Sequence, residues 1–178
     1  WCDWLCSTEG SGSRNQQAKA AFIRVANEVE TALSANPHNS SSSSDNEHPF
    51  FLGAGDELGT ADIIFIPYLE RMAASLAYYK GYNIRESHPK IHQWFVALEK
   101  RDTYLGTQSD YHTHAHDLPP QMGSCLFSST SEQRLVASAV DNGTAAIDNS
   151  NVNNAVVALL KYETSQEEPG DGSASQEA

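Results

Sequence analysis

Apolar residues follow a helical spacing in the first long stretch of the chain, at Phe22, Val25, Val29 and Leu33. Intervals of three and four residues place these side chains on one face, so the pattern predicts a helix from about residue 15 to residue 34. Asn36-Pro37 is expected to end this helix, because proline lacks the N–H that continues the hydrogen-bond ladder. The serine run at residues 40–44 then predicts a disordered insertion.

A second stretch, from about residue 60 to residue 79, is apolar nearly all round. A helix without a polar face belongs in the interior of a bundle, and we expect this one to be the central helix. Pro67 lies past its first turn and is expected to kink it, and Lys80-Gly81 supplies the stop.

A third helix is predicted from about residue 89 to residue 101, with Pro89 in its first turn, where the missing N–H costs little. Its expected buried stripe is Ile91, Trp94 or Phe95, and Leu98. The following segment, from residue 104 to residue 125, is predicted to be irregular, because Pro119-Pro120 favours extended backbone.

These patterns divide the chain into three parts. Residues 1–13 are interpreted as the remnant of a preceding helix with its linker, and residues 14–125 as a helical domain. Residues 126–178 are interpreted as a disordered acidic tail with short helix candidates at about 131–140 and 152–162. The predicted fold class is all-α, a bundle of about four or five helices.

Composition narrows the choice of partners. The chain has 178 residues, of which 39% are hydrophobic and 19% charged, which suits one domain with polar ends. Its 11 Lys and Arg against 23 Asp and Glu give a net charge of -12. This excess of acid argues against nucleic acids and anionic membranes, because both reward a basic surface. No segment of the sequence approaches the roughly 20 apolar residues that span a bilayer.

The cysteines indicate a reducing compartment. Cys2, Cys6 and Cys125 are too few for a disulfide scaffold and lack the spacing of a zinc site. We therefore predict a cytoplasmic protein, and we expect Cys2 and Cys6 to be buried or inert thiols, because Asp3 disfavours a thiolate. The chain opens at Trp1 inside an amphipathic hexamer, which we interpret as the sign of a fragment.

Two motifs follow the first helix in order. Gly55-Asp56-Glu57-Leu58-Gly59-Thr60-Ala61-Asp62-Ile63 opens the central helix, and Pro89-Lys90-Ile91-His92-Gln93-Trp94 opens the next one. Over about residues 14–106 the chain resembles the all-helical C-terminal domain of glutathione S-transferases. Members of that family carry a GD-x-[LI]-[ST]-x-AD-[IL] run and a P-x-[IL]-x-x-W run at these places, so the resemblance implies the same helical bundle.

The first motif departs from the family pattern at one position. The family has Ser or Thr three residues before the aspartate, which forms a capping box with it, whereas this chain has Gly59 there. We expect Asp62 to bond back to the Gly59 N–H, so a structural capping role is predicted for Gly59 and Asp62. General acid–base chemistry at Asp62 is the alternative.

The resemblance also implies that the glutathione site and the catalytic residue belong to another domain. In glutathione S-transferases, the glutathione site and the catalytic Ser, Cys or Tyr lie largely in an N-terminal thioredoxin-like domain, whose strands are absent from this sequence. The helical domain supplies the wall of the hydrophobic-substrate pocket and part of the dimer interface. We therefore expect glutathione as co-substrate, a homodimer, and a thioredoxin-like domain in cis as partner. We expect no catalytic residue in this chain and no activity from it alone.

Three side chains are candidates for substrate contacts in that wall: Tyr68, Arg71 and Tyr104. Aromatic side chains suit the pocket of an apolar substrate, and Arg71 interrupts an otherwise apolar helix. A place in the core is the alternative for the tyrosines. An interhelical ion pair or a snorkelling side chain is the alternative for Arg71.

Two other functions compete with this one. The first is a non-catalytic helical module for protein–protein interaction, because such domains recur as docking units and a fold does not fix an activity. The second is a metal site, because His112, His114 and His116 would share one face in extended backbone, and imidazole binds zinc, copper or nickel. No ligand pair from a rigid element accompanies them, so we predict no metal and a structural role for this loop.

Overall fold

The computed structural model describes residues 1–7, 12–37, 48–53 and 57–143. Regular structure in these ranges is helical: α1 (Cys2–Leu5), α2 (Ser13–Ser34), α3 (Thr60–Lys80), α4 (Ile84–Ser87), α5 (Pro89–Leu98), α6 (Asp102–Leu105), α7 (Tyr111–Met122) and α8 (Ser131–Asp141). This confirms the all-α prediction for the described part of the chain. The serine run, most of the acidic tail and the helix candidate at 152–162 lie outside the described residues.

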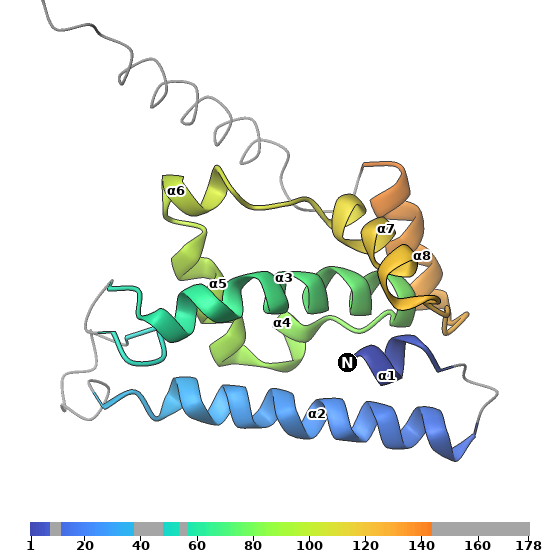
Figure 1. Cartoon of the computed structure of the whole chain (residues 1–178), viewed down its shortest axis with the longest axis horizontal. Helices are drawn as coiled ribbons and strands as arrows, with labels where there is room; N and C mark the ends of the chain where they lie inside the picture. Colours follow the sequence, from blue (N-terminus) through green and yellow to red (C-terminus); the bar gives the residue numbers. More distant parts are fainter. Residues whose placement is uncertain (8–11, 38–47, 54–56, 144–178) are drawn as a thin grey trace, which may run out of the picture.

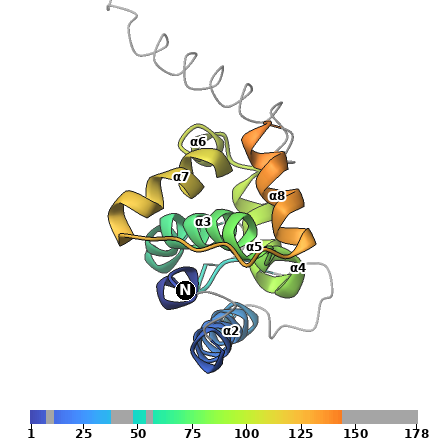
Figure 2. The same ribbon diagram turned by 90° about the vertical axis from the view of Figure 1, so that its right-hand side faces the viewer.

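Helix α3 occupies the middle of the bundle (Figures 1 and 2). Helix α2 runs along one side of it, and α7 and α8 cover the opposite side (Figure 1). Helices α4 and α5 complete the bundle, with α5 packed against α2. The predicted central helix is therefore central, and both of its neighbouring predicted helices are present.

The two ends of α3 are capped in different ways. At its start Gly59 is the N-cap, and the Asp62 carboxylate accepts a hydrogen bond from the Gly59 N–H at 2.9 Å. At its end Gly81 has a positive φ of 65°, a conformation that costs glycine little. A Cβ at Gly81 would also lie 2.7 Å from the backbone N of Gln133, so α8 approaches α3 closely there.

Burial along α3 differs between its halves. From Leu69 to Lys80 most side chains are buried, among them Leu69, Ala73, Leu76, Tyr78 and Tyr79. Before Leu69 the helix is largely exposed, so the expectation that it is covered all round is wrong for its first half. The physical reason is that α7 and α8 pack over the later turns and leave the earlier ones uncovered (Figure 1).

Helix α5 takes its N-terminal cap from another helix. The Glu30 carboxylate on α2 accepts hydrogen bonds from the backbone N–H groups of Lys90 and Ile91, at 2.7 Å and 3.0 Å. A carboxylate at a helix N-terminus meets unpaired N–H groups and the positive end of the helix dipole. This contact fixes α5 to α2 and places Trp94, which is fully buried, in the core.

Helix α7 corrects the prediction of an irregular, extended segment over residues 104–125. Asp110 caps the start of α7 by accepting a hydrogen bond from the Thr113 N–H at 2.7 Å. Pro119 lacks the N–H that would pair with the Ala115 carbonyl, and the Tyr79 hydroxyl donates to that carbonyl instead, at 3.1 Å. The prolines are therefore accommodated inside a helix, because α3 supplies the replacement donor.

The folded body extends beyond the predicted domain limits at both ends. Near the start, Trp4 and Leu5 belong to the core, and near the end Val140 does. The buried Lys80 ammonium joins both regions by donating to the carbonyls of Ser7 and Leu126, each at 2.7 Å. Within the region assigned to the tail, the helix predicted at about 131–140 is present as α8, and it packs on α3.

The cysteines lie near the contact between the N-terminal segment and the segment around residue 126. Cys2 and Cys6 are exposed, so of the two expected alternatives, buried or inert thiols, the buried one is wrong; the core-facing residues of α1 are Trp4 and Leu5. The Cys6 thiol donates to the Ser124 carbonyl at 3.1 Å. Burial raises the pKa of the Cys125 thiol to about 11, so this thiol is protonated near neutral pH.

Candidate substrate-binding surface

Four large apolar side chains are uncovered on the first half of α3. Ile63, Ile64 and Tyr68 are 60%, 55% and 54% exposed, and Phe65 is 37% exposed. We call these four residues the α3 patch. Exposed apolar residues that are scattered singly need no explanation, whereas several within two turns of one helix make a candidate surface for binding something apolar.

An apolar hollow lies next to this patch. It has a volume of about 200 Å³ and is lined by Trp1 and by side chains of α1, α2, α3 and α4, including Phe22, Val25 and Met72. Phe65 belongs both to the hollow and to the α3 patch. Ligand pockets are usually larger, about 300–1,000 Å³, so this hollow alone is smaller than most of them.

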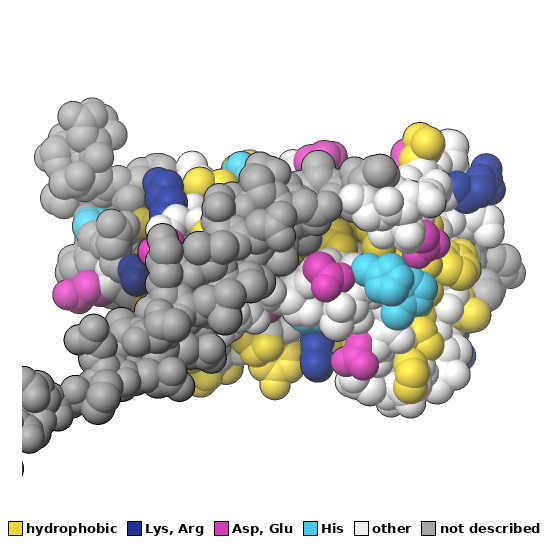
Figure 3. Space-filling model, turned by 90° about the horizontal axis from the view of Figure 1, so that it is seen from above, with side chains coloured by type: hydrophobic (Ala, Val, Ile, Leu, Met, Phe, Trp, Pro, Cys, Tyr) yellow, Lys and Arg dark blue, Asp and Glu magenta, His cyan; other side chains and the backbone are white. Residues whose placement is uncertain are grey.

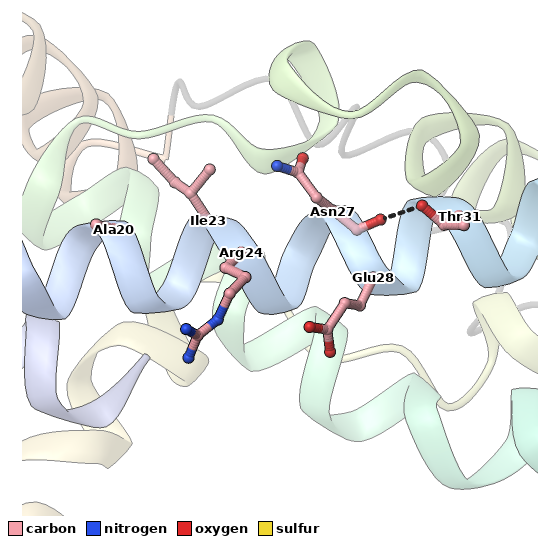
Figure 4. A pocket seen from close by; sticks show the side chains of 6 residues that line it. All are labelled: Ala20, Ile23, Arg24, Asn27, Glu28 and Thr31. Atoms are coloured by element: carbon pink, nitrogen blue, oxygen red, sulfur yellow. Dashed lines mark hydrogen bonds between the residues drawn. The ribbon is translucent and has the colours of Figure 1, made fainter.

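A larger depression lies on α2, but the side chains that line it are not arranged to hold a ligand. Its volume is about 630 Å³, and the residues that line it are Ala20, Ile23, Arg24, Asn27, Glu28 and Thr31. All of them come from α2, and Arg24 and Glu28 point away from Ile23 and Asn27 (Figure 4). The Thr31 hydroxyl is already bonded to the Asn27 carbonyl at 2.8 Å. Polar groups from one helix do not converge on a ligand, so we favour the hollow beside the α3 patch.

Tyr68 and Arg71 lie one turn apart on α3, so they share one face of the helix with Ile64. Arg71 is half-buried. Within the part of the chain that the structure describes, no carboxylate lies within ion-pair distance of the Arg71 guanidinium. The structure therefore brings two of the three predicted substrate contacts together, since Arg71 lies beside Tyr68 of the α3 patch.

Tyr104 lies apart from these two, against the Glu70 face of α3. Its side chain is 5% exposed, and its hydroxyl accepts a hydrogen bond from the Gln108 amide at 3.2 Å. Burial raises the pKa of Tyr104 above its ordinary range, and the charge and hydrogen bond of Glu70 raise it further. Tyr104 is thus a neutral, buried hydroxyl rather than an exposed contact.

Glu70 itself reaches towards α7. One Glu70 carboxylate oxygen is 3.8 Å from Nε2 of His114, and both side chains are largely buried. Among the described residues, Oε1 of Glu70 and Nε2 of His114 have no hydrogen-bond partner. His114 is therefore directed into the bundle, away from the side on which His112 and His116 lie.

Asp62 is occupied by three structural contacts. Besides the Gly59 N–H, its carboxylate accepts hydrogen bonds from the Trp94 indole N–H at 2.8 Å and from the Phe51 backbone N–H at 3.1 Å. The side chain is fully buried. A carboxylate with three N–H donors and no exposed surface cannot reach a substrate, so the geometry favours capping over acid–base chemistry.

A further grouping was missed by the sequence analysis. His112, His116 and Asp141 each offer one ligand atom, and these atoms lie within 4.8 Å of one another. The four-residue spacing of His112 and His116 could have indicated this, had the segment been interpreted as a helix. Asp141 is too far along the chain to be associated with them by any local pattern.

The comparisons with known proteins agree with this fold. A family model described as glutathione S-transferase, C-terminal domain, matches residues 13–97. No curated protein and no solved structure gives a significant match to the chain. Among the described residues, no helix has the length and apolar character needed to cross a membrane.

Proposed function

We propose that this chain, whose residues 13–97 match the family model of the glutathione S-transferase C-terminal domain, supplies the hydrophobic-substrate wall of a glutathione transfer site. The observation that carries the proposal is the α3 patch beside an apolar hollow. An apolar electrophile would bury these side chains, and each Å² of apolar surface removed from water is worth about 25 cal/mol.

The small volume of the hollow supports a shared site. At about 200 Å³ it is too small to enclose a substrate with its glutathione partner. A thioredoxin-like domain in cis would provide the facing wall, the glutathione-binding groups and the catalytic residue. This chain alone is accordingly expected to be inactive.

We assign different roles to the three candidate residues. Tyr68 presents an exposed aromatic ring, and Arg71 presents a guanidinium without a carboxylate partner among the described residues, so both would contact the substrate or the facing domain. Tyr104 is buried against Glu70, so it would stabilise the position of α3 without contacting the substrate.

The proposed chemistry needs no charge from this chain. The glutathione thiolate forms a carbon–sulfur bond with the electrophile, and the leaving group departs with the electron pair of the bond that breaks. In the related thiol chemistry, glutathione thiolate attacks a mixed disulfide and releases the second thiol.

We further propose that the protein is cytoplasmic, where glutathione keeps thiols reduced, and that it forms a homodimer.

A non-catalytic interaction module is the second candidate. The same α3 patch favours it, since exposed Ile63, Ile64 and Tyr68 could equally be covered by a partner protein. The two functions differ in what they require: transfer needs a thioredoxin-like domain in the same polypeptide, whereas docking does not.

The test is to isolate the protein from its native cell with an antibody against this chain. Its intact mass is then measured, and the same preparation is assayed for glutathione transfer to 1-chloro-2,4-dinitrobenzene. The proposal predicts a mass well above 19.4 kDa and measurable transfer. A larger polypeptide without transfer overturns it. A mass near 19.4 kDa, without transfer and in a stable complex, favours the interaction module.

A further inference from the structure

Helix α7 places two histidines side by side on the surface. His112 and His116 are one turn apart, and the centroids of their rings are 4.2 Å apart. Nε2 of His116 is 3.2 Å from Oδ1 of Asp141, the last residue of α8. Figure 3 shows histidine side chains gathered on this face with acidic side chains beside them.

We propose that His112, His116 and Asp141 form a binding site for one divalent transition-metal ion, with Zn²⁺ as the probe. Two imidazoles and one carboxylate are ligands that zinc accepts, and three protein ligands leave a fourth position for water. The acidic character of the chain, with a net charge of -12, favours the approach of a cation.

The geometry requires only a small adjustment. The three ligand atoms lie within 4.8 Å of one another, whereas tetrahedral zinc with bonds of about 2.0–2.1 Å brings its ligands to about 3.3 Å. All three side chains are exposed, so rotations about their χ angles can close the difference without moving the helices.

A second layer of contacts orients the carboxylate. The Tyr78 hydroxyl on α3 donates to Oδ1 and Oδ2 of Asp141, at 3.0 Å and 3.3 Å. The Tyr78 ring also lies edge-on to the His116 ring, with centroids 5.2 Å apart. Hydrogen bonds of this kind hold a ligand in place and are part of a functioning metal site.

His114 is excluded from the site by the helix. It lies two residues from each of the other histidines and is directed at Glu70 in the bundle, 3.8 Å away. The proposed ligand set therefore contains Asp141 in place of His114, which the sequence analysis had considered together with His112 and His116. This difference makes His114 a discriminating control.

Bound metal would link the two helices that cover α3. Two ligands come from α7, and the third closes the end of α8, so binding would restrain the last described turn of the bundle. A ligand that binds only the folded state stabilises it by mass action, so zinc is expected to raise the Tm.

The experiment is titration of the full chain with ZnCl₂ by isothermal calorimetry, after treatment with EDTA and dialysis. We expect one ion per chain and a higher Tm with zinc. His112→Ala, His116→Ala and Asp141→Asn are each expected to weaken binding about tenfold or more and to abolish the shift in Tm. Circular dichroism verifies that each variant keeps its helix content.

Two matched variants serve as controls. His114→Gln and His92→Ala, the latter on α5, are expected to bind zinc as the parent chain does. Loss of binding in His114→Gln with the helix content retained would overturn the proposed ligand set. Binding by Asp141→Asn that is as tight as that of the parent chain would overturn it also, because a surface histidine pair alone would then account for the zinc. Absence of stoichiometric binding by the parent chain would overturn the site altogether.

Discussion

At the scale of single residues, Asp62 shows how one carboxylate joins three segments. It receives N–H donors from Gly59 before α3, from Phe51 in the preceding loop and from Trp94 on α5. Its burial is complete, so no water can replace a lost acceptor. The side chain thus connects the start of the central helix to the core.

Replacing this carboxylate is expected to destabilise the fold strongly. Asp62→Ala leaves three buried donors without an acceptor, so we expect the free energy of unfolding to fall by about 3 kcal/mol or more. Asp62→Asn keeps one acceptor oxygen and should cost less. Urea denaturation followed by circular dichroism measures both. Similar stability of Asp62→Ala and the parent chain would contradict the structural role.

His88 gives the fold a dependence on pH. Burial lowers the pKa of His88 below 6.5, while the Glu30 carboxylate partly opposes this shift. Nε2 of His88 lies 3.0 Å from the Tyr82 hydroxyl, and it can accept that hydrogen bond only when the ring is neutral.

The sign of the effect follows from proton binding. Below pH 6.5 the unfolded chain binds a proton at His88 more readily than the folded chain does, so stability is lost as the pH falls. His88→Gln should make the free energy of unfolding less dependent on pH between 7 and 5, because it removes a side chain that titrates in this range. Denaturation curves at several pH values check this, with His92→Gln as control. Equal pH dependence in His88→Gln and the parent chain would refute it.

At the scale of elements, α7 is the helix that the sequence analysis did not predict. Pro119-Pro120 normally argues against a helix, and in an isolated segment that argument would hold. The Asp110 cap and the Tyr79 hydroxyl supply what the prolines remove. The Asp110 signal is local and could have been recognised, whereas the Tyr79 contact spans 36 positions along the chain and could not.

The hydroxyl of Tyr79 should therefore be needed for α7. Tyr79→Phe leaves the Ala115 carbonyl buried without its donor, and we expect a loss of about 1–3 kcal/mol in the free energy of unfolding. Tyr68→Phe, which alters an exposed hydroxyl, is the matched control and should change stability little. Equal stability of the two variants would mean that another donor serves Ala115.

The helices α2, α3 and α5 were predictable because their signals are periodic and local. Phe22 and Leu33 face the core at helical spacing, and Pro89 and Gly81 mark ends as expected. The exposed first half of α3 was not predictable, since an apolar helix looks the same whether or not its neighbours reach along its whole length.

At the scale of the whole molecule, contacts between distant segments define the folded unit. Lys80 bonds to carbonyls at residues 7 and 126, and Leu126 donates to the Leu5 carbonyl at 2.8 Å. These contacts make α1 and α8 parts of one body with α3. Composition assigned the α8 region to an acidic tail, because an acidic, polar stretch gives no sign of a distant partner.

The candidate site was predictable only in part, for the same reason. Tyr68 and Arg71 share a helix face that can be derived from their spacing, whereas the burial of Tyr104 depends on its contact with Glu70, a residue distant in the sequence. The grouping of His112, His116 and Asp141 likewise depends on the approach of α8 to α7.

The central claim is that the α3 patch contacts the hydrophobic substrate. The most direct test measures KM for the electrophile and for glutathione in the full-length protein carrying Tyr68→Ala. Leu135→Ala, which shortens an exposed apolar side chain on α8, is the control. We predict that Tyr68→Ala raises KM for the electrophile about tenfold, as expected from the loss of about 1.4 kcal/mol of apolar contact, and leaves KM for glutathione unchanged. Unchanged KM for the electrophile, or the same change in Leu135→Ala, would contradict the claim.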